Sequence, residues 1–340
     1  MTKALVPPGS EIAGPATVQQ APAPVARPVA SAPVPPDPRY LALRNFAMSI
    51  SVFNVLGYTL LGFEQPWLWP ILCVLTAYAT EIGFEFLGGW AQQRPLRFDP
   101  RNPRSVYEFL LPAHITALAV NMLVYANNQL LPVLFGVVVG ITAKNVLQAP
   151  INGRMRHFMN PSNFGITVTL VAFSSFVSIA PPYQFSENVN AFYRIGIVLV
   201  IAMAGTVLNA SLTRKIPLLL GWLGGFVIQA VLRYWIYDVA LNSALAVMSG
   251  IAFILFTNYM ISDPGTTPSK ARPQFMFGSA VAMVYGVLMA FNVVYTLFFS
   301  VTLVCGLRGA GWWVVHLARK RSHRPTRQAG TPRVTEGSLQ

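Results

Sequence analysis

Charged residues are in short supply in this sequence. Asp, Glu, Lys and Arg make up only 10% of the 340 residues, whereas hydrophobic residues make up 54%, and the mean hydropathy is +0.51. A soluble domain usually carries about 25% charged residues. The shortage excludes an ordinary soluble enzyme and predicts an all-α protein that crosses a membrane many times.

Cysteine is nearly absent as well. Cys73 and Cys305 both lie in apolar stretches and form no CxxC pair. We therefore expect no disulfide, zinc site or iron–sulfur cluster built by this chain, and we interpret both residues as small apolar fillers. The sequence also contains no G-x-G-x-x-G motif and no P-loop, which argues against nucleotide chemistry of those two kinds.

The hydrophobic residues are grouped into about ten segments of roughly membrane-spanning length. Because five is an odd number, two groups of five spans would form two inverted repeats. The expected segments are 45–63, 68–90, 107–125, 130–148, 161–179, 193–211, 216–235, 240–259, 275–292 and 295–316.

The two ends of the chain differ from this region in composition. Residues 1–40 are rich in Pro, Ala and Val and lack the pattern of a signal peptide, and residues 319–340 are basic. We expect two disordered cytoplasmic tails, 1–40 and 319–340, on either side of a membrane domain at 41–318.

The Lys and Arg residues predict the orientation. Ten spans place both termini on one side, and if that side is the cytoplasm, only Arg194 and Arg233 of the 24 Lys and Arg lie outside the inner loops, tails and their junctions. The positive-inside rule predicts such a bias. The net charge of +13 then reflects topology and contact with membrane lipid, and we expect no nucleic-acid partner.

Two short polar segments interrupt the apolar pattern on the cytoplasmic side. Asn160-Pro161 opens the fifth segment, and Asp263-Pro264 lies between the eighth and ninth. Asx followed by Pro is the pairing expected at the N-cap and first position of a helix. Two such helix starts would offer free N–H groups and positive dipole ends to an anion or a ring carbonyl. The alternative is that both segments are only tight loops.

A few polar residues fall inside the predicted spans. Glu81 and Glu85 lie four residues apart on one face of the second segment, His114 lies in the third, and Lys144 closes the fourth. Intramembrane ionisable residues are candidates for function, and Glu81, Glu85 and His114 could line an ion or proton path. The alternative is a structural network, with a glutamate paired to Lys144 or a loop arginine and His114 bonded to a carbonyl.

The span count, Asn160–Gly165 (NPSNFG) and Ser262–Ser269 (SDPGTTPS) together resemble the RnfD/NqrB family of membrane electron-transport subunits. The resemblance extends from about residue 45 to about residue 306, and within the family the chain looks closest to the UnbU-type branch associated with enediyne biosynthesis. Gly140–Lys144 is also similar to the family's region between the fourth and fifth helices. The resemblance implies a bacterial inner (plasma) membrane protein that works with other redox subunits, which would supply any nicotinamide or iron–sulfur chemistry.

The resemblance also implies a cofactor. Family members hold a flavin near the cytoplasmic side, so a non-covalent flavin (riboflavin or FMN), or a quinone, is expected here. Its expected neighbours are Asn160, Pro161, Asn163, Asp263, Thr266, Thr267 and Lys144. Amide donors and helix N-termini would stabilise the negative charge of a reduced flavin.

One feature departs from the family. Members attach a second flavin, FMN, covalently through the Thr of a Ser-Gly-Ala-Thr motif in the outer loop after the fifth helix. The corresponding loop, residues 180–190, contains no Thr. We therefore expect no covalent FMN, which puts a complete transmembrane electron path in doubt.

Two other functions remain open at this stage. The family's ten-helix architecture resembles that of urea and ammonium channels, so a small-solute or ion transporter or channel is the main alternative. A scaffold that recruits partners through its tails is the third.

Overall fold

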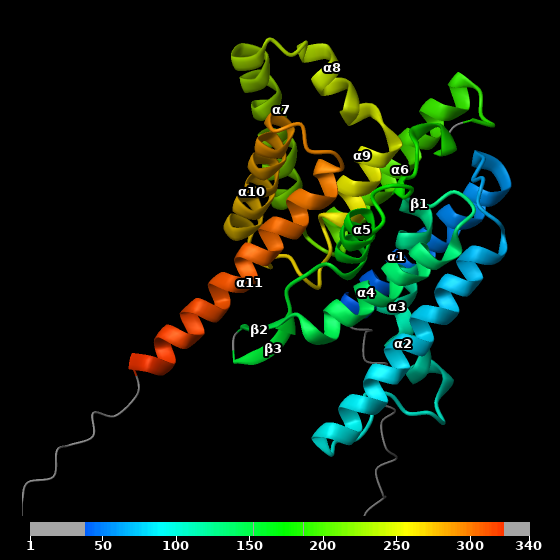
Figure 1. The fold of residues 1–340 in the computed structure, drawn as a ribbon, viewed down its shortest axis with the longest axis vertical. Coiled ribbons are helices and arrows are strands. Elements are labelled where there is room, and N and C mark those ends of the chain that lie inside the picture. Colours follow the sequence, from blue (N-terminus) through cyan, green and yellow to red (C-terminus); the bar gives the residue numbers. More distant parts are fainter. Residues whose placement is uncertain (1–37, 152, 186, 323–340) are drawn as a thin grey trace, which may run out of the picture. The chain divides into compact units, whose positions relative to one another are not determined.

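The computed structural model describes residues 38–151, 153–185 and 187–322, which are mostly helical (Figure 1). The long helices are α1 (Pro38–Leu56), α2 (Leu68–Gln92), α3 (Pro103–Leu123), α4 (Leu130–Val146), α5 (Pro161–Ala172), α6 (Ala191–Ser211), α7 (Ile216–Tyr237), α10 (Ala271–Ala290) and α11 (Thr296–Ser322). The shorter ones are η1 (Gly57–Leu61), η2 (Pro182–Phe185), α8 (Leu241–Ala246), η3 (Val247–Ser249), α9 (Ile251–Leu255) and η4 (Phe256–Met260).

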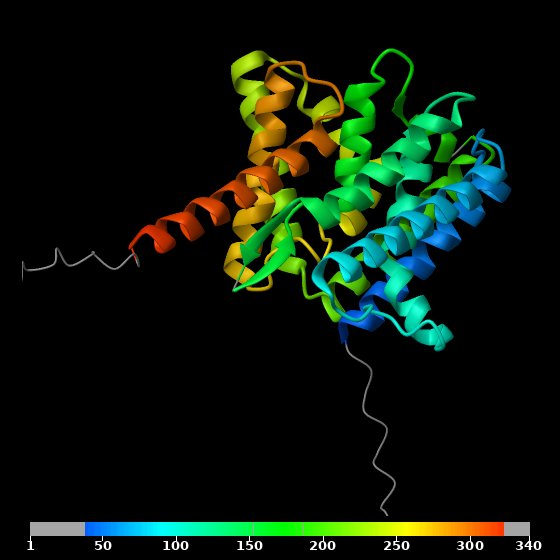
Figure 2. The ribbon, with the colours of Figure 1, turned by 60° about the horizontal axis from the view of Figure 1, so that its bottom comes forward.

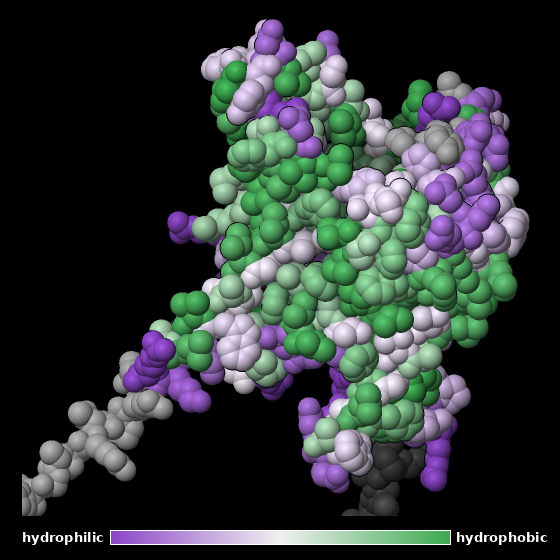
Figure 3. All heavy atoms as spheres, in the orientation of Figure 1, coloured by the Kyte–Doolittle hydropathy of each residue, from purple (hydrophilic) through white to green (hydrophobic). Residues whose placement is uncertain are grey.

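Within these described ranges, six helices are long and apolar enough to cross a membrane: α2, α3, α6, α7, α10 and α11. Residues 241–249 and 251–260 form a pair bent by 65° that would count as a seventh span. On the face shown in Figure 3, hydrophobic residues cover much of the middle of the helices, and hydrophilic residues gather toward their ends. These features indicate a helical, membrane-embedded protein.

Each of the ten expected segments contains helix, but the structure does not establish ten spans. The clearest difference is α5, which has 12 residues instead of the expected 161–179. At 1.5 Å per residue it is about 18 Å long, well short of a hydrocarbon core of about 30 Å. The helix ends at Ala172, and Ser174 and Ser175, which favour turns, follow directly.

The expected tails fall largely outside the described residues. Pro38, Arg39 and Tyr40 begin α1, and residues 319–322 continue α11. The proposed tail boundaries at 40 and 319 therefore lie two turns or less inside helices.

Short strands connect some of the helices. β1 (Val124–Tyr125) pairs antiparallel with β4 (Ser178–Ile179), with Val124 opposite Ile179. β2 (Gln148–Ile151) and β3 (Arg154–His157) form an antiparallel hairpin in which Ile151 lies opposite Arg154. The hairpin packs against α11 (Figure 2). The Trp313 indole N–H of α11 donates to the Gln148 carbonyl at 3.0 Å.

Glycines bring two pairs of helices into close contact. A Cβ on Gly165 of α5 would lie 2.2 Å from the Gly136 carbonyl oxygen of α4, and one on Gly140 would lie 2.5 Å from the Pro161 carbonyl oxygen. A Cβ on Gly278 of α10 would likewise lie 2.2 Å from the Leu218 carbonyl oxygen of α7. Small residues at such positions let helix backbones approach closely, as in membrane bundles. The contacts on α4 fix the first half of α5 against the middle of α4.

Candidate functional site

A cavity of about 210 Å³ lies where α5 begins, and we call it the central cavity. Its ionisable and amide side chains come from α4, β3, the start of α5 and the segment before α10, which place Lys144, His157, Asn160 and Asp263 around it. The apolar wall comes mainly from α1 and α3. Its residues include Leu43, Phe46, Pro112 and Ile115.

Asn160 performs the predicted capping role. Its side-chain oxygen accepts from the Asn163 N–H at 3.0 Å, and Pro161 occupies the first helical position. Its amide nitrogen donates to the Met260 carbonyl at 2.9 Å, across 100 residues of sequence. Because one buried side chain binds both segments, the start of α5 and the end of η4 are held together. The sequence predicted the cap, but not this second bond.

The expectation that Asp263 begins a helix is wrong. Asp263 opens a single turn, in which its carbonyl accepts from the Thr267 N–H at 3.2 Å, and α10 begins only at Ala271. The carboxylate accepts from the Gly265 N–H at 3.0 Å and from the Thr266 hydroxyl at 2.7 Å. A helix continuing from Asp263 would have Pro268 in its interior, where Pro removes a backbone bond and clashes with the preceding turn.

The central cavity is lined by a cation and an anion from different segments, and a buried carboxylate lies behind the cation. Lys144 donates to Glu81 at 2.6 Å, and Glu81 is fully buried behind it in α2. The second oxygen of Glu81, Oε2, is buried and has no hydrogen-bond partner among the described residues. Lys144 thus presents a cation to the cavity with a single partner behind it, whereas Asp263 presents an anion from another segment.

His157 lies between these charges and lines the central cavity. Burial lowers the pKa of His157; Asp263 opposes this shift, while Lys144 and Arg156 reinforce it. A neutral imidazole near neutral pH can both donate and accept a hydrogen bond. Sequence reasoning missed this residue because the hairpin that carries it was not expected, although Asn152-Gly153 is a strong hairpin signal.

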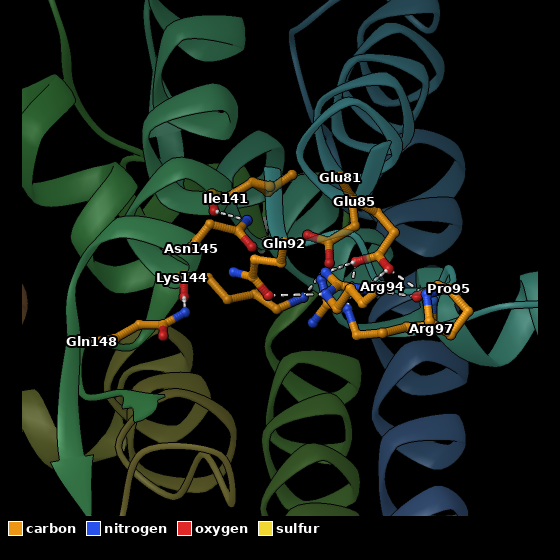
Figure 4. A network of polar contacts seen from close by, with 10 residues as sticks. All are labelled: Glu81, Glu85, Gln92, Arg94, Pro95, Arg97, Ile141, Lys144, Asn145 and Gln148. Atoms are coloured by element: carbon orange, nitrogen blue, oxygen red, sulfur yellow. Dashed lines mark hydrogen bonds and ion pairs between the residues drawn. The ribbon is translucent and has the colours of Figure 1, made fainter. Parts of the chain in front are cut away.

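Glu85 has a different environment, shown in Figure 4. Arg94 donates to both of its oxygens, at 2.6 and 3.1 Å, and Arg97 adds its backbone N–H at 2.7 Å and its side chain at 2.5 Å. The carboxylate is fully buried and accepts all four of these hydrogen bonds. Glu85 therefore holds the loop after α2 in place. This arrangement is the structural network that was the alternative expected from the sequence.

His114 belongs to a third polar group, between α1, α2 and α3. Its ring nitrogens bond the hydroxyls of Ser51 at 2.8 Å and Tyr78 at 2.9 Å, rather than a carbonyl. Seven residues along α3, Asn121 donates to Asn54 of α1 at 3.1 Å. His114 and Asn121 therefore share the face predicted for them, and that face joins α3 to α1 and α2. His114 also lines a separate cavity of about 370 Å³ between α1, α2 and α3.

The remaining expected flavin neighbours are divided between sites. Thr266 and Thr267 line a second cavity beside the central one. The Asn163 amide points to α11, donating to the Phe298 carbonyl at 2.9 Å and the Thr302 hydroxyl at 2.8 Å. The structure thus brings Lys144, Asn160, Pro161 and Asp263 together around one cavity, while Asn163 is used for helix packing.

Tyr259 is a further cavity residue that the sequence did not single out. It precedes the Asp263 turn and makes edge-to-face contacts with Phe46 and Phe53, with ring centroids 5.7 and 5.6 Å apart. An aromatic residue within an apolar segment gives no signal of its own, because most such residues only pack.

Taken together, the fold and the composition define a helical protein with six or seven candidate membrane spans among its described residues and a cavity with polar lining residues. No known protein-family model matches the chain, and no curated protein shows significant similarity to it.

Proposed function

We propose that the protein is a membrane subunit of a flavin- or quinone-linked electron-transport complex, similar to RnfD/NqrB proteins, and that the central cavity holds the redox ring without a covalent bond. The observation that carries this proposal is the meeting of Asn160 and Asp263, 103 positions apart in the sequence, around one cavity with Lys144 and His157. Ligand sites combine apolar walls with a few converging polar groups, as this cavity does.

The donor set fits such a ring. Flavins and quinones have flat apolar faces and polar edges, and the cavity offers apolar side chains of α1 and α3 together with an ammonium, an imidazole and a carboxylate. When bound, such a group would supply electron transfer. Lys144 would stabilise negative charge on the ring edge, and His157 and Asp263 would exchange protons with it or orient it. The cavity volume of about 210 Å³ lies below the range of about 300–1,000 Å³ that is typical of small-molecule sites, so it has room for a ring or headgroup and not for a dinucleotide.

The proposal includes partners. Nothing in the described residues forms a metal-binding group of three or more His, Cys, Asp or Glu, so electrons would reach and leave the ring through other redox subunits. A role in natural-product biosynthesis, of the enediyne type, follows only from the resemblance to UnbU-type proteins.

The test is the visible spectrum of gently purified, folded protein, followed by mass spectrometry of what is released on denaturation. We expect a flavin or a quinone in the wild type. Asp263→Asn should reduce its amount, whereas Asp238→Asn should retain it, because Asp238 caps the far end of α7 in a left-handed conformation that Asn tolerates. Folded wild-type protein without either cofactor would reject the proposal.

A transporter or channel for small solutes or ions is the second candidate. The observation that favours it is the 65° bend between residues 241–249 and 251–260, since discontinuous helices form the substrate sites of many transporters. Solute flux into liposomes, compared between wild type and Glu81→Gln, tests this function. Flux that the substitution abolishes would favour transport over electron transfer.

A further inference from the structure

A second cavity lies beside the central cavity and shares His157, Pro264 and Gly265 with it. We call it the basic cavity. Its volume is about 760 Å³, and its walls come from the hairpin, the loop between α6 and α7, the segment before α10, and α11. Its size falls within the range of about 300–1,000 Å³ that is typical of small-molecule sites.

The charge of the basic cavity has one sign. Five Lys or Arg residues line it, and no Asp or Glu does: Arg156, Arg214, Lys215, Lys270 and Arg308. Within the described ranges, the ion pairs with carboxylates involve Arg94, Arg97, Arg104 and Lys144, and none of these five. Clustered cations in a recess attract and concentrate anions.

Two of the cations are held in place by backbone carbonyls. Lys215 is only 4% exposed, and its ammonium donates to the Pro268 carbonyl at 2.6 Å. Arg308 donates to the Thr266 carbonyl and lies over the Phe277 ring, 5.8 Å from its centroid. Burial lowers the pKa of Lys215 to about 8, and Arg308 adds to this shift while Asp263 opposes it. An anion beside Lys215 would stabilise its charged form.

Trp312 supplies an independent observation. It follows Arg308 by four residues on α11, so both side chains lie on one face of the helix and line the basic cavity. Its indole nitrogen is buried and has no hydrogen-bond partner among the described residues. Buried donors are almost always paired in folded proteins, so this N–H would be satisfied by a ligand only after the indole turns toward the cavity.

We propose that the basic cavity binds the phosphate group of a small molecule, with the phosphate among Lys215, Arg308 and Trp312. Two cations and a neutral N–H match phosphate oxygens in charge and hydrogen bonding. The organic part would lie against Ile151 and the prolines of the wall. The phosphate could belong to a soluble mononucleotide-sized ester or to a phospholipid headgroup. The proposal holds whether or not the central cavity contains a redox ring.

Calorimetric titration of the full chain in neutral-lipid nanodiscs tests the proposal with two pairs of probes, FMN against riboflavin and AMP against adenosine. Each pair differs by a phosphate. We expect the phosphorylated member of at least one pair to bind at least tenfold more tightly. A parallel comparison of thermal stability in nanodiscs with and without phosphatidylglycerol tests the lipid source.

Stabilisation by phosphatidylglycerol without preference for soluble phosphates would assign the phosphate to a lipid headgroup. No preference in either pair and no effect of phosphatidylglycerol would overturn the proposal.

Variants locate the site. Arg308→Gln should lower the affinity for the phosphorylated probe, or the stabilisation by phosphatidylglycerol, about tenfold. Trp312→Phe, which removes the N–H and keeps an aromatic ring, should lower it severalfold while leaving the ligand-free melting temperature nearly unchanged. Arg154→Gln is the matched control, because Arg154 is exposed on the same hairpin and is not part of the basic cavity. An equal loss in Arg154→Gln would overturn the assignment to this cavity.

Discussion

Glu81 and Glu85 lie one turn apart on α2 and are both fully buried, yet the structure treats them differently. Glu85 receives four hydrogen bonds from Arg94 and Arg97 of the following loop. Glu81 receives one, from Lys144, and its second oxygen has no partner in the part of the chain that the structure describes. Glu85, with its four hydrogen bonds, has a structural role and holds the loop in place. Glu81 has only one hydrogen bond and lies behind the cavity-lining Lys144, so its interactions can change with what occupies the cavity.

The largest expected loss of stability follows substitution of Glu85. Glu85→Gln removes the anion that accepts four hydrogen bonds from two partly exposed arginines, so the free energy of unfolding should fall more than in any other variant described here. Thermal unfolding in detergent, followed by size-exclusion chromatography, measures this loss. Glu108→Gln is the control, since its pair with Arg104 is exposed and should contribute less than about 1 kcal/mol. Equal losses of stability in the two variants would show that Glu85 does not hold the loop after α2 in place.

Glu81→Gln should be milder, with a loss of about 1–3 kcal/mol. The amide oxygen can still accept from Lys144, and only one contact is altered. Cofactor content should nevertheless fall more than in Glu85→Gln protein that remains folded, because Lys144 lines the central cavity. Absorbance and mass spectrometry measure the cofactor per mole of folded protein in the two variants. A lower cofactor content in Glu85→Gln than in Glu81→Gln would contradict the comparison.

A double substitution sharpens the same contrast. Replacing both members of a buried ion pair by apolar residues of similar size is often nearly neutral for stability. Glu81→Leu with Lys144→Met should therefore remain within about 1 kcal/mol of the wild type, yet lose the cofactor. Lys144→Met alone, which strands the buried Glu81, should be clearly less stable than the double variant. A double variant that still retains cofactor would remove Lys144 from the proposed site.

The smallest expected effect is the pH dependence of stability that comes from His157, which lines the central cavity. Because burial lowers the pKa of His157 below its unfolded value of about 6.5, the unfolded chain binds more protons than the folded one below that pH. Stability contributed by neutral His157 is therefore present above pH 6.5 and is lost as the pH falls through and below it. Melting temperatures from pH 7.5 to 5 should fall less steeply in His157→Gln than in the wild type. Identical slopes would show that His157 does not titrate with folding.

Much of the helical layout could be predicted from the sequence, because apolar runs and Asx-Pro starts are local signals. The Asn160 cap is confirmed, and helices occur in all ten expected segments. The number of membrane spans was predicted less accurately. About ten were expected, whereas six or seven helices within the described residues have the length and hydropathy of a span. Inverted repeats and the cytoplasmic location of both termini stay predictions.

The site was predicted less completely, for tertiary reasons. Pairing of Glu81 and Glu85 with cations was foreseen only as an alternative, and which glutamate meets which cation depends on how the loop after α2 folds back. Asn163 was placed with the cofactor, but α11 packs against α5 and takes its amide. The contact between Gly165 and Gly136 could have been suspected from the four-residue spacing of Gly136 and Gly140.

The most direct test of the central claim is to identify what the central cavity holds. Protein purified under mild conditions should release a flavin or a quinone on denaturation, in an amount close to one per chain. Asn160→Ala and Asp263→Asn should each lose most of it while the Asp238→Asn control keeps it. Folded wild-type protein that releases neither, or variants that retain as much as the control, would contradict the assignment of a redox ring to this cavity.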